Sequence, residues 1–283
     1  MADVWGQDHP KKRLLQAYHL LTNPSRLIRS GTQPPSGFLL TGPTGSGKTL
    51  LARALAGEAQ LPFLQTTASD LMLGSGFRGH QNNHDRMAQQ LHPIQSLFNA
   101  AREMAPSIIF IDEIHPLILD QGPHGEKLLA CMDGFEKSEC QILVIGATNE
   151  GWIRERSNEA FWRPGRLEET LKMDLPDHHA RRKFIQSQFP KLFPTGKTGQ
   201  NAYTLDDLVR RTAQWSPAKL QQWFRESSMR ASCRSNGQPS VTIEDLRDAC
   251  TYLKYPNGKT TDLIRPEDRI LTAWHEAGHA LVH

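Results

Sequence analysis

The stretch Thr41-Gly42-Pro43-Thr44-Gly45-Ser46-Gly47-Lys48-Thr49 decides the fold of this chain, because it fits the phosphate-binding pattern G-x-x-x-x-G-K-[ST] in full. A short apolar run, residues 37–40, precedes it, and an apolar helix-forming segment, residues 50–56, follows it. These are the strand and the helix that the pattern requires on either side, so an accidental glycine-rich turn is disfavoured. The sequence therefore predicts a strand, a phosphate-binding loop and a helix in this order.

The candidate nucleotide-binding residues of this loop and the start of the helix are consecutive: Gly42, Pro43, Thr44, Gly45, Ser46, Gly47, Lys48, Thr49 and Leu50. Glycines let the backbone turn tightly, so that successive N–H groups point at phosphate oxygens near the positive end of the helix dipole. Lys48 adds a positive charge on a flexible side chain. Thr49 offers a hydroxyl ligand to Mg²⁺, which prefers oxygen donors. The loop therefore predicts a nucleoside triphosphate with Mg²⁺ as its ligand.

Composition limits the partners of the chain. The net charge of +3 over 283 residues is too small to indicate a nucleic-acid partner. The cysteines have no C-x-x-C spacing, as expected for reduced thiols: Cys131, Cys140, Cys233 and Cys250. No apolar stretch approaches the length of a membrane span, and the N-terminus has no signal-peptide pattern. We therefore expect a cytoplasmic location.

Two carboxylates follow the apolar run 107–111, which has the form of a buried parallel strand. Ligands of such sheets bind at the carboxyl ends of the strands. Asp112 would hold Mg²⁺ through water, and Glu113 would orient and deprotonate a water that attacks the γ-phosphate. An Asp-Glu pair after a strand can also cap a helix, but its position downstream of a phosphate loop favours the catalytic interpretation.

Other polar residues complete the catalytic candidates, which are Glu113, Asn149, Arg163 and Arg166. Asn149 follows the apolar strand 141–145 and would help to place the attacking water. Arg163 and Arg166 flank a Pro-Gly turn and form a candidate pair of arginine fingers, which would neutralise charge in the transition state. The alternative is a pair of surface arginines in a turn.

The order of elements predicts an α/β fold followed by helices. Strands are expected at residues 37–40, 62–66, 107–111, 141–145 and 169–175, with a large polar surface loop at about 73–93. Later helices are expected at residues 205–212, 216–231 and 242–253. We predict an α/β nucleotide-binding domain over 1–200, a helical domain over 201–256, and a linker with a last helix over 257–283.

The last predicted helix carries His275-Glu276-Ala277-Gly278-His279. Two histidines one turn apart share a helix face, so His275 and His279 could bind one zinc with Glu276 as general base. A catalytic zinc needs three protein ligands, however, and no third is evident nearby. The sequence therefore predicts an incomplete zinc site.

Taken together, these features closely resemble the AAA+ module of FtsH-type ATP-dependent zinc proteases over essentially the whole chain. The matching motifs are the opening 2–6, the Walker A loop 42–49, the Walker B strand 108–113, and residues 132–135, 147–149, 163–166, 216–220 and 275–279. The resemblance implies a P-loop NTPase (AAA+) parallel-sheet sandwich followed by a small all-helical lid. It also implies that the last motif begins a protease domain.

The resemblance adds residues and partners to the prediction. It implies adenine contacts from Asp3, Val4 and Gly6, and a nucleotide contact from Ala218 in the sensor-2 helix. It implies ATP and Mg²⁺ as ligands, arginine fingers that reach a neighbouring subunit, a homo-hexamer and protein substrates. Membrane attachment would come only through segments absent from this chain, and Zn²⁺ would bind only where the peptidase site is completed.

The sequence departs from that family at the candidate pore loop, Phe77-Arg78-Gly79, whose middle residue is charged. Pro217 also replaces a usual glycine. The predicted function is therefore an ATP-hydrolysing motor that remodels protein or delivers it for proteolysis. The alternatives are a nucleotide-binding scaffold that moves no substrate, and part of an active zinc metallopeptidase within a fuller chain.

Overall fold

The computed structural model describes residues 4–22, 35–73, 92–119, 122–133, 141–149, 151, 153, 158–192, 202–234, 241–255, 270, 274 and 277. The chain forms two compact units, one of Met1–Ser187 with Ala213–Leu220 and one of Gln188–Thr212 with Gln221–His283. All five strands that the structure describes belong to the first unit. The predicted domain boundary at residue 200 stays a prediction, because residues 193–201 lie outside the described part.

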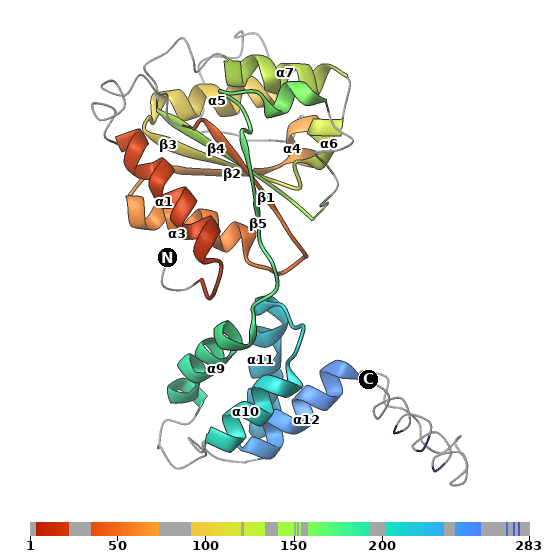
Figure 1. Cartoon of the computed structure of the whole chain (residues 1–283). Coiled ribbons are helices and arrows are strands. Elements are labelled where there is room, and N and C mark those ends of the chain that lie inside the picture. The colour runs from red at the N-terminus through yellow and green to blue at the C-terminus, as the bar shows by residue number, and fades with distance from the viewer. Residues whose placement is uncertain are drawn as a thin grey trace. The chain divides into compact units, whose positions relative to one another are not determined.

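The first unit is built on a parallel sheet (Figure 1). Its strands are β1 (Gly37–Thr41), β2 (Phe63–Thr67), β3 (Ser107–Asp112), β4 (Ile142–Thr148) and β5 (Glu169–Lys172). The spatial order is β2-β3-β4-β1-β5, and every neighbouring pair is parallel. All five predicted strands are thus confirmed, and the carboxyl ends of all five lie at one edge of the sheet.

The strands β1, β3 and β4 have apolar interiors because both faces of the sheet are covered. Side chains alternate between two cores: Leu39 packs into one, whereas Phe38 and Leu40 pack into the other. Ile109 and Phe110 on β3 divide between the two cores in the same way. Burial on both sides explains why these strands read as continuous apolar runs in the sequence.

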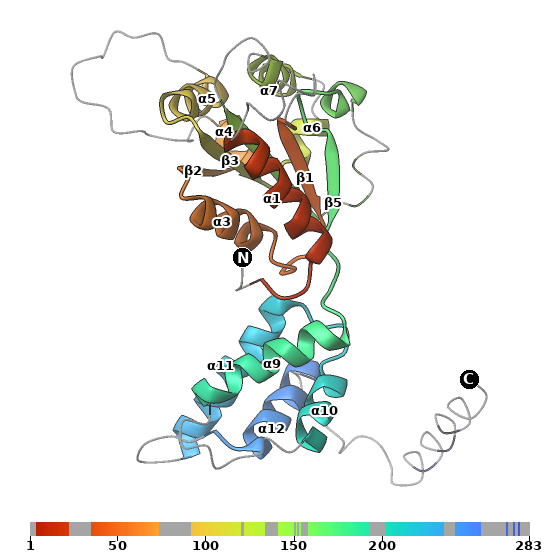
Figure 2. The ribbon, with the colours of Figure 1, turned by 60° about the vertical axis from the view of Figure 1, so that its left-hand side comes forward.

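Helices cover the two faces of the sheet (Figures 1 and 2). The first face carries α1 (Asp8–Thr22) and α3 (Lys48–Ala59), which share a core with Phe110 of β3. The second face carries α4 (Ala68–Leu73), α5 (Pro93–Glu103), α6 (His115–Leu119) and α7 (Pro123–Asp133). The P-loop helix α3 is therefore anchored on the sheet by its apolar side.

The helices α4, α6 and α7 were not predicted from the sequence. The first two have six and five residues, too short to show the periodicity of an amphipathic helix. A 3₁₀ helix, η1 (Glu159–Trp162), precedes β5 and is capped by Asn158, whose side-chain oxygen accepts from the Ala160 N–H at 2.9 Å. The predicted loop 73–93 lies mostly outside the described residues.

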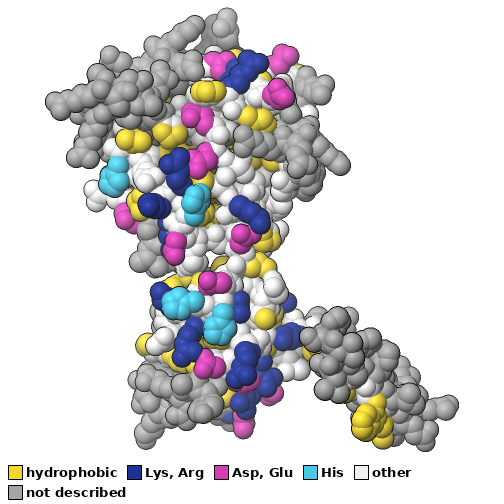
Figure 3. Space-filling view, viewed as in Figure 1, with side chains coloured by type: hydrophobic (Ala, Val, Ile, Leu, Met, Phe, Trp, Pro, Cys, Tyr) yellow, Lys and Arg dark blue, Asp and Glu magenta, His cyan; other side chains and the backbone are white. Residues whose placement is uncertain are grey.

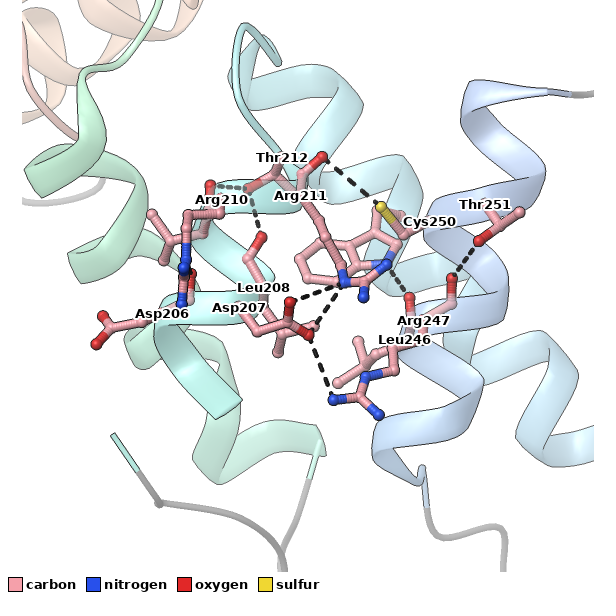
Figure 4. Close-up of polar contacts among 12 residues, drawn as sticks. Asp206, Asp207, Leu208, Arg210, Arg211, Thr212, Leu246, Arg247, Cys250 and Thr251 are labelled. Atoms are coloured by element: carbon pink, nitrogen blue, oxygen red, sulfur yellow. Dashed lines mark hydrogen bonds and ion pairs between the residues drawn. The ribbon is translucent and has the colours of Figure 1, made fainter. Parts of the chain in front are cut away.

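The described part of the second unit is helical, as predicted. It contains α10 (Ala202–Arg211), α12 (Ile243–Lys254), most of α11 (Pro217–Arg234) and the end of α9 (His178–Leu192), residues 188–192. The first parts of α9 and α11 belong to the first unit. Trp223 is fully buried, and its indole N–H donates to the Leu246 carbonyl at 2.7 Å. Across these helices, Asp207 accepts from both Arg211 and Arg247 (Figure 4). Among the described residues no helix combines the length and the hydropathy that a bilayer crossing requires.

Candidate functional site

The phosphate-binding loop connects β1 to α3, as predicted. β1 ends at Thr41, and α3 begins at Lys48 with Gly47 as its N-cap. No side chain caps this N-terminus, so the N–H groups of its first turn have no side-chain acceptor. The loop therefore presents backbone donors at the positive end of the helix dipole.

Backbone contacts on both sides fix the path of the loop. A Cβ at Gly42 would lie 2.1 Å from the Met173 carbonyl oxygen, and one at Gly45 would lie 2.8 Å from the Ala218 Cβ. The Ala218 N–H donates to the Gly45 carbonyl at 3.3 Å. Residues 213–220 belong to the same compact unit as the loop, so Ala218 lies against the predicted nucleotide site.

Lys48 is a buried cation at the centre of this loop, with 8% of its surface exposed. Its ammonium group donates to the carbonyls of Gly42 at 2.7 Å and Pro43 at 3.2 Å, and to the side-chain oxygen of Asn149 at 2.6 Å. Burial lowers the pKa of Lys48, while the charge of Asp112 opposes the shift. No carboxylate of the described residues forms an ion pair with it, so its charge is available to an anion.

The hydroxyl of Ser46 provides a test of fit for a phosphate group. Ser46 is 2% exposed, and its Oγ atom is buried without any hydrogen-bond partner among the described residues. Buried hydroxyls are rarely left without a partner in native proteins. An orphaned hydroxyl donor in the loop between β1 and α3 fits a phosphate oxygen.

The candidate magnesium ligands lie together. The Thr49 hydroxyl, in the first turn of α3, donates to the Asp112 carboxylate at the end of β3, at 3.2 Å. These are hard oxygen donors, which Mg²⁺ prefers, and the residues present therefore fit the ion. When bound, Mg²⁺ would be held by these two side chains and would neutralise phosphate charge. Among the described residues, no group of three or more His, Cys, Asp and Glu side chains forms a metal cluster.

Glu113 comes directly after β3 in a left-handed backbone conformation, with φ of 49°. Its N–H donates to the Asp112 carboxylate at 3.0 Å, and the next residue, Ile114, is fully buried and donates to the Ala147 carbonyl at 2.9 Å. A glutamate in this region is strained, and strain of this kind is concentrated at functional sites. The Glu113 side chain is exposed and has no partner among the described residues.

Strand register brings Asn149 to the loop. β1 and β4 pair so that Thr41 lies beside Thr148. The next residues along the two strands are Gly42 and Asn149, which explains why the Asn149 side chain meets Lys48. The structure thus assembles Lys48, Thr49, Asp112, Glu113 and Asn149 at the carboxyl edge of the sheet, although their individual roles remain predictions.

The two candidate arginines differ in their surroundings. Arg163 is exposed, and its side chain forms no hydrogen bond or ion pair with the described residues. Arg166 has a side chain only 12% exposed, and its guanidinium binds the Asp133 carboxylate at 2.6 and 2.7 Å and the Ala160 carbonyl. Among the described residues, no hydrogen bond or ion pair joins either arginine side chain to the phosphate loop.

The candidate adenine contacts lie beside the start of α9. Val4 is buried in the core of the first unit, and the Trp5 ring meets Phe184 edge-on with centroids 6.3 Å apart. A Cβ at Gly6 would lie 3.2 Å from the Ala180 Cβ. Leu50, in the first turn of α3, is 41% exposed. The contact of Val4 and Gly6 with adenine, and of Leu50 with the nucleotide, stays a prediction.

Several predicted site residues lie outside the described part of the chain. They are Asp3, the pore-loop candidates Phe77, Arg78 and Gly79, and the zinc candidates His275, Glu276 and His279. Their roles stay predictions.

Sequence reasoning missed two carboxylates that hold the arginine turn. Asp133 binds Arg166, and Glu168 accepts from the N–H groups of Gly165 at 2.9 Å and Ser36 at 3.1 Å. Glu168 could have been found, because a carboxylate three residues after a Pro-Gly turn can reach the N–H of that turn. Asp133 lies in the motif 132–135, but nothing local indicates its pairing with Arg166, because 33 positions separate the two residues.

The chain matches a known family and known proteins. Residues 38–175 match the model of the family described as ATPase family associated with various cellular activities (AAA). The chain is 34% identical over 293 residues to the ATP-dependent zinc metalloprotease FtsH of Thermus thermophilus, and 32% identical over 294 residues to that of Thermotoga maritima. Each match covers 99% of this chain but only 43% and 44% of the relative, so the chain spans less than half the length of these relatives.

A solved structure supports the same assignment. The crystal structure of the FIGL-1 AAA domain in complex with ADP matches with a TM-score of 0.69 and 25% identity, over 98% of this chain and 89% of that one. The parallel order β2-β3-β4-β1-β5 and the loop between β1 and α3 lie within the aligned fold. This chain therefore carries an ATPase domain of the AAA family over residues 38–175 and is similar over nearly its whole length to the AAA module of FtsH.

Proposed function

We propose that this chain is an ATP-driven motor module, which couples ATP hydrolysis to the remodelling of proteins or their delivery for proteolysis. The observation that carries the proposal is the pair of contacts at the sheet edge. Lys48 meets Asn149 at 2.6 Å, and Thr49 meets Asp112 at 3.2 Å. These contacts join the phosphate loop to the ends of β3 and β4, where the predicted hydrolytic residues lie.

Each side chain has a defined task in this proposal. Loop N–H groups, Ser46 and Lys48 bind the phosphates, and the FIGL-1 domain, whose structure contains ADP, supports a nucleotide as ligand. Glu113 takes a proton from the attacking water, and Asn149 orients that water. The exposed Glu113 carboxylate is free for this task, because no described residue engages it.

Catalysis across a subunit boundary completes the proposed mechanism. Arg163 is exposed and unpaired within the described chain, so its guanidinium is available to a second copy. In a closed ring, each heterologous interface would place one arginine beside the nucleotide of its neighbour. We propose a homo-hexamer on the strength of the FtsH resemblance.

Protein substrates are the proposed cargo. The relatives named above are proteases, and the visible faces of the two units show cationic and anionic side chains interspersed (Figure 3). A surface with mixed charge of this kind does not favour binding of a polyanion. The scattered cysteines fit a reducing compartment, so a cytoplasmic location is part of the proposal.

The experiment that tests the proposal is the response of ATP turnover to an unfolded protein. We expect an unfolded protein such as casein to stimulate phosphate release by the chain, and Phe77→Ala to retain basal turnover but lose the stimulation. Folded lysozyme serves as the control ligand. Basal turnover that is equal with and without casein would instead support the scaffold alternative, which the intact set of hydrolytic residues does not favour.

A further inference from the structure

The turn at residues 163–166 is held at several points. It follows η1, and the Arg166 N–H donates to the Arg163 carbonyl at 3.2 Å, which closes the turn. The Leu167 N–H then donates to the Phe161 carbonyl at 3.0 Å. Phe161 and Leu167 are both buried in the core beneath the second face of the sheet. The base of the turn is therefore part of the packed core.

The side chain of Arg166 connects this turn to the end of α7. Its Nε and one terminal nitrogen bind the two Asp133 oxygens at 2.6 and 2.7 Å, and the other terminal nitrogen donates to the Ala160 carbonyl. Bidentate ion pairs of this geometry are among the strongest hydrogen-bonded contacts in proteins. Asp133 directly follows Met132, which is fully buried in the same core. The guanidinium is thus tied to a helix that is itself fixed.

Glu168 fastens the other side of the turn to β1. One carboxylate oxygen accepts from the N–H of Gly165 and from the N–H of Ser36, just before β1. The Glu168 N–H donates to the Gly37 carbonyl at 3.2 Å. Space is tight here, since a Cβ at Gly37 would lie 2.6 Å from the Arg166 carbonyl oxygen. The turn is therefore fastened to the strand that delivers the phosphate loop.

Arg163 alone has a free guanidinium in this turn. It is exposed and unpaired among the described residues, whereas most of the hydrogen-bonding capacity of Arg166 is already used within its own subunit. We propose that Arg166 is a positioning residue: together with Asp133 and Glu168 it clamps the turn so that Arg163 alone reaches the nucleotide of the neighbouring subunit. The inference rests on the proposed catalysis in trans and divides the roles of the two predicted arginine fingers.

The clamp makes Asp133 as important as Arg166, which gives the decisive test. We expect Arg163→Ala to lower kcat by roughly 10³-fold, the loss typical of an arginine finger. Arg166→Ala and Asp133→Ala should each lower kcat by about 10- to 100-fold through misplacement, with KM for ATP unchanged. The double variant should lose no more than Arg166→Ala alone, because Asp133 acts through its contact with Arg166. If Arg166 bound phosphate itself, Asp133→Ala would keep parental turnover while Arg166→Ala lost as much as Arg163→Ala, and the inference would be overturned.

A charge swap adds a test by rescue. Asp133→Arg combined with Arg166→Asp retains an ion pair across the same gap but removes the cation at position 166. We expect kcat of the swapped double variant to be at least 10-fold higher than kcat of Arg166→Asp alone. The matched control is Arg230→Ala, which breaks an ion pair with Glu226 on α11 and should keep parental turnover. A loss of kcat in that control equal to the loss in Arg166→Ala would contradict a specific clamp.

The outcomes also separate this inference from the proposed function. Catalysis in trans fails if Arg163→Ala turns ATP over at the parental rate in verified assemblies, whatever the clamp variants do. The clamp fails if Arg163→Ala is impaired but Asp133→Ala is not. Circular dichroism and thermal melting of each variant confirm that the compared chains are folded.

Discussion

The ammonium group of Lys48 donates a 2.6 Å hydrogen bond to the side-chain oxygen of Asn149, although 101 positions separate the two residues. The contact exists because β1 and β4 are neighbouring parallel strands whose ends are in register. A bound triphosphate would compete with Asn149 for the same ammonium group. The pair therefore links the phosphate loop to the residue proposed to orient the attacking water.

This relationship gives a prediction for the two side chains. Lys48→Ala should abolish ATP binding, because it removes the buried charge that faces the phosphates. Asn149→Ala should keep affinity within a few-fold and lower kcat by about 10²-fold, since it removes one group placed for the transition state. Titration with a fluorescent ATP analogue and steady-state phosphate release measure the two effects. Equal losses of affinity in both variants would contradict separate roles.

Mixed assemblies test catalysis in trans. Subunits with Arg163→Ala retain a complete phosphate loop, and subunits with Lys48→Ala retain the arginine. Mixing the two inactive variants should therefore restore part of the turnover at interfaces that combine both intact halves. Phosphate release across a series of mixing ratios, with assembly verified by light scattering, provides the measurement. An absence of rescue at every ratio would show that Arg163 does not act on the neighbouring nucleotide.

Backbone geometry predicts that replacing two loop glycines by alanine lowers the free energy of unfolding by different amounts. Gly42 has φ of 152° and its Cβ would meet a backbone oxygen at 2.1 Å, whereas Gly47 has φ of 98° with no atom within 4 Å of its Cβ. Gly42→Ala should destabilise the chain by about 3 kcal/mol through strain and steric overlap. Gly47→Ala should destabilise the chain by only roughly 1–2 kcal/mol, because its left-handed backbone conformation is strained for alanine. Urea denaturation of both variants measures the difference, and equal costs would contradict the described path of the loop.

The network of Asp207 with Arg211 and Arg247 in the second unit predicts a pH dependence of stability. Burial opposes ionisation of Asp207, but hydrogen bonds and charges from Arg211 and Arg247 outweigh it, so the pKa of Asp207 falls below its usual value of 3.8 (Figure 4). A carboxylate with a lowered pKa stabilises the fold above its usual pKa and loses that effect as pH falls through the folded value. Asp207→Asn should therefore cost about 1 kcal/mol or less at neutral pH, since both arginines are about half exposed.

The cost of Asp207→Asn should diminish as pH falls below the usual pKa of 3.8, and it should vanish below the lowered pKa of Asp207 in the folded chain, where this carboxyl is neutral. Thermal melts between pH 2 and pH 7 test this dependence. Asp248→Asn is the matched control, because Asp248 is exposed on the neighbouring helix and has no partner among the described residues. A destabilisation of the Asp207 variant that is constant over this pH range would contradict the network.

The sheet and the phosphate loop could be predicted because local sequence determines them. Strands buried on both faces, such as β3 and β4, have to be apolar throughout, and the loop needs its glycines and Lys48 at fixed spacing. The sequence also indicated Asp112 and Glu113, because carboxylates after a buried strand stand out. The strand register that brings Asn149 to Lys48 depends on packing, and sequence alone did not specify it.

The rest of the site depends on contacts between distant segments. The bidentate pair of Arg166 with Asp133 joins the turn 163–166 to the end of α7, and no sequence pattern connects the two. The helices α4 and α6 are too short for periodicity to reveal them, and tertiary packing stabilises them instead. Two arginines in one turn looked equivalent in the sequence, and only their partners show that their guanidinium groups have different surroundings.

The most direct test of ATP hydrolysis at this site is the turnover of Glu113→Gln beside the parental chain. Glu113 lies at the end of β3, next to Asp112 and in a strained turn, with its carboxylate unpaired among the described residues. We predict that Glu113→Gln binds ATP with parental affinity and releases phosphate at least about 10²-fold more slowly, while the exposed control Glu103→Gln hydrolyses at the parental rate. Parental phosphate release by Glu113→Gln would contradict the assignment of this residue as general base and with it the proposed mechanism.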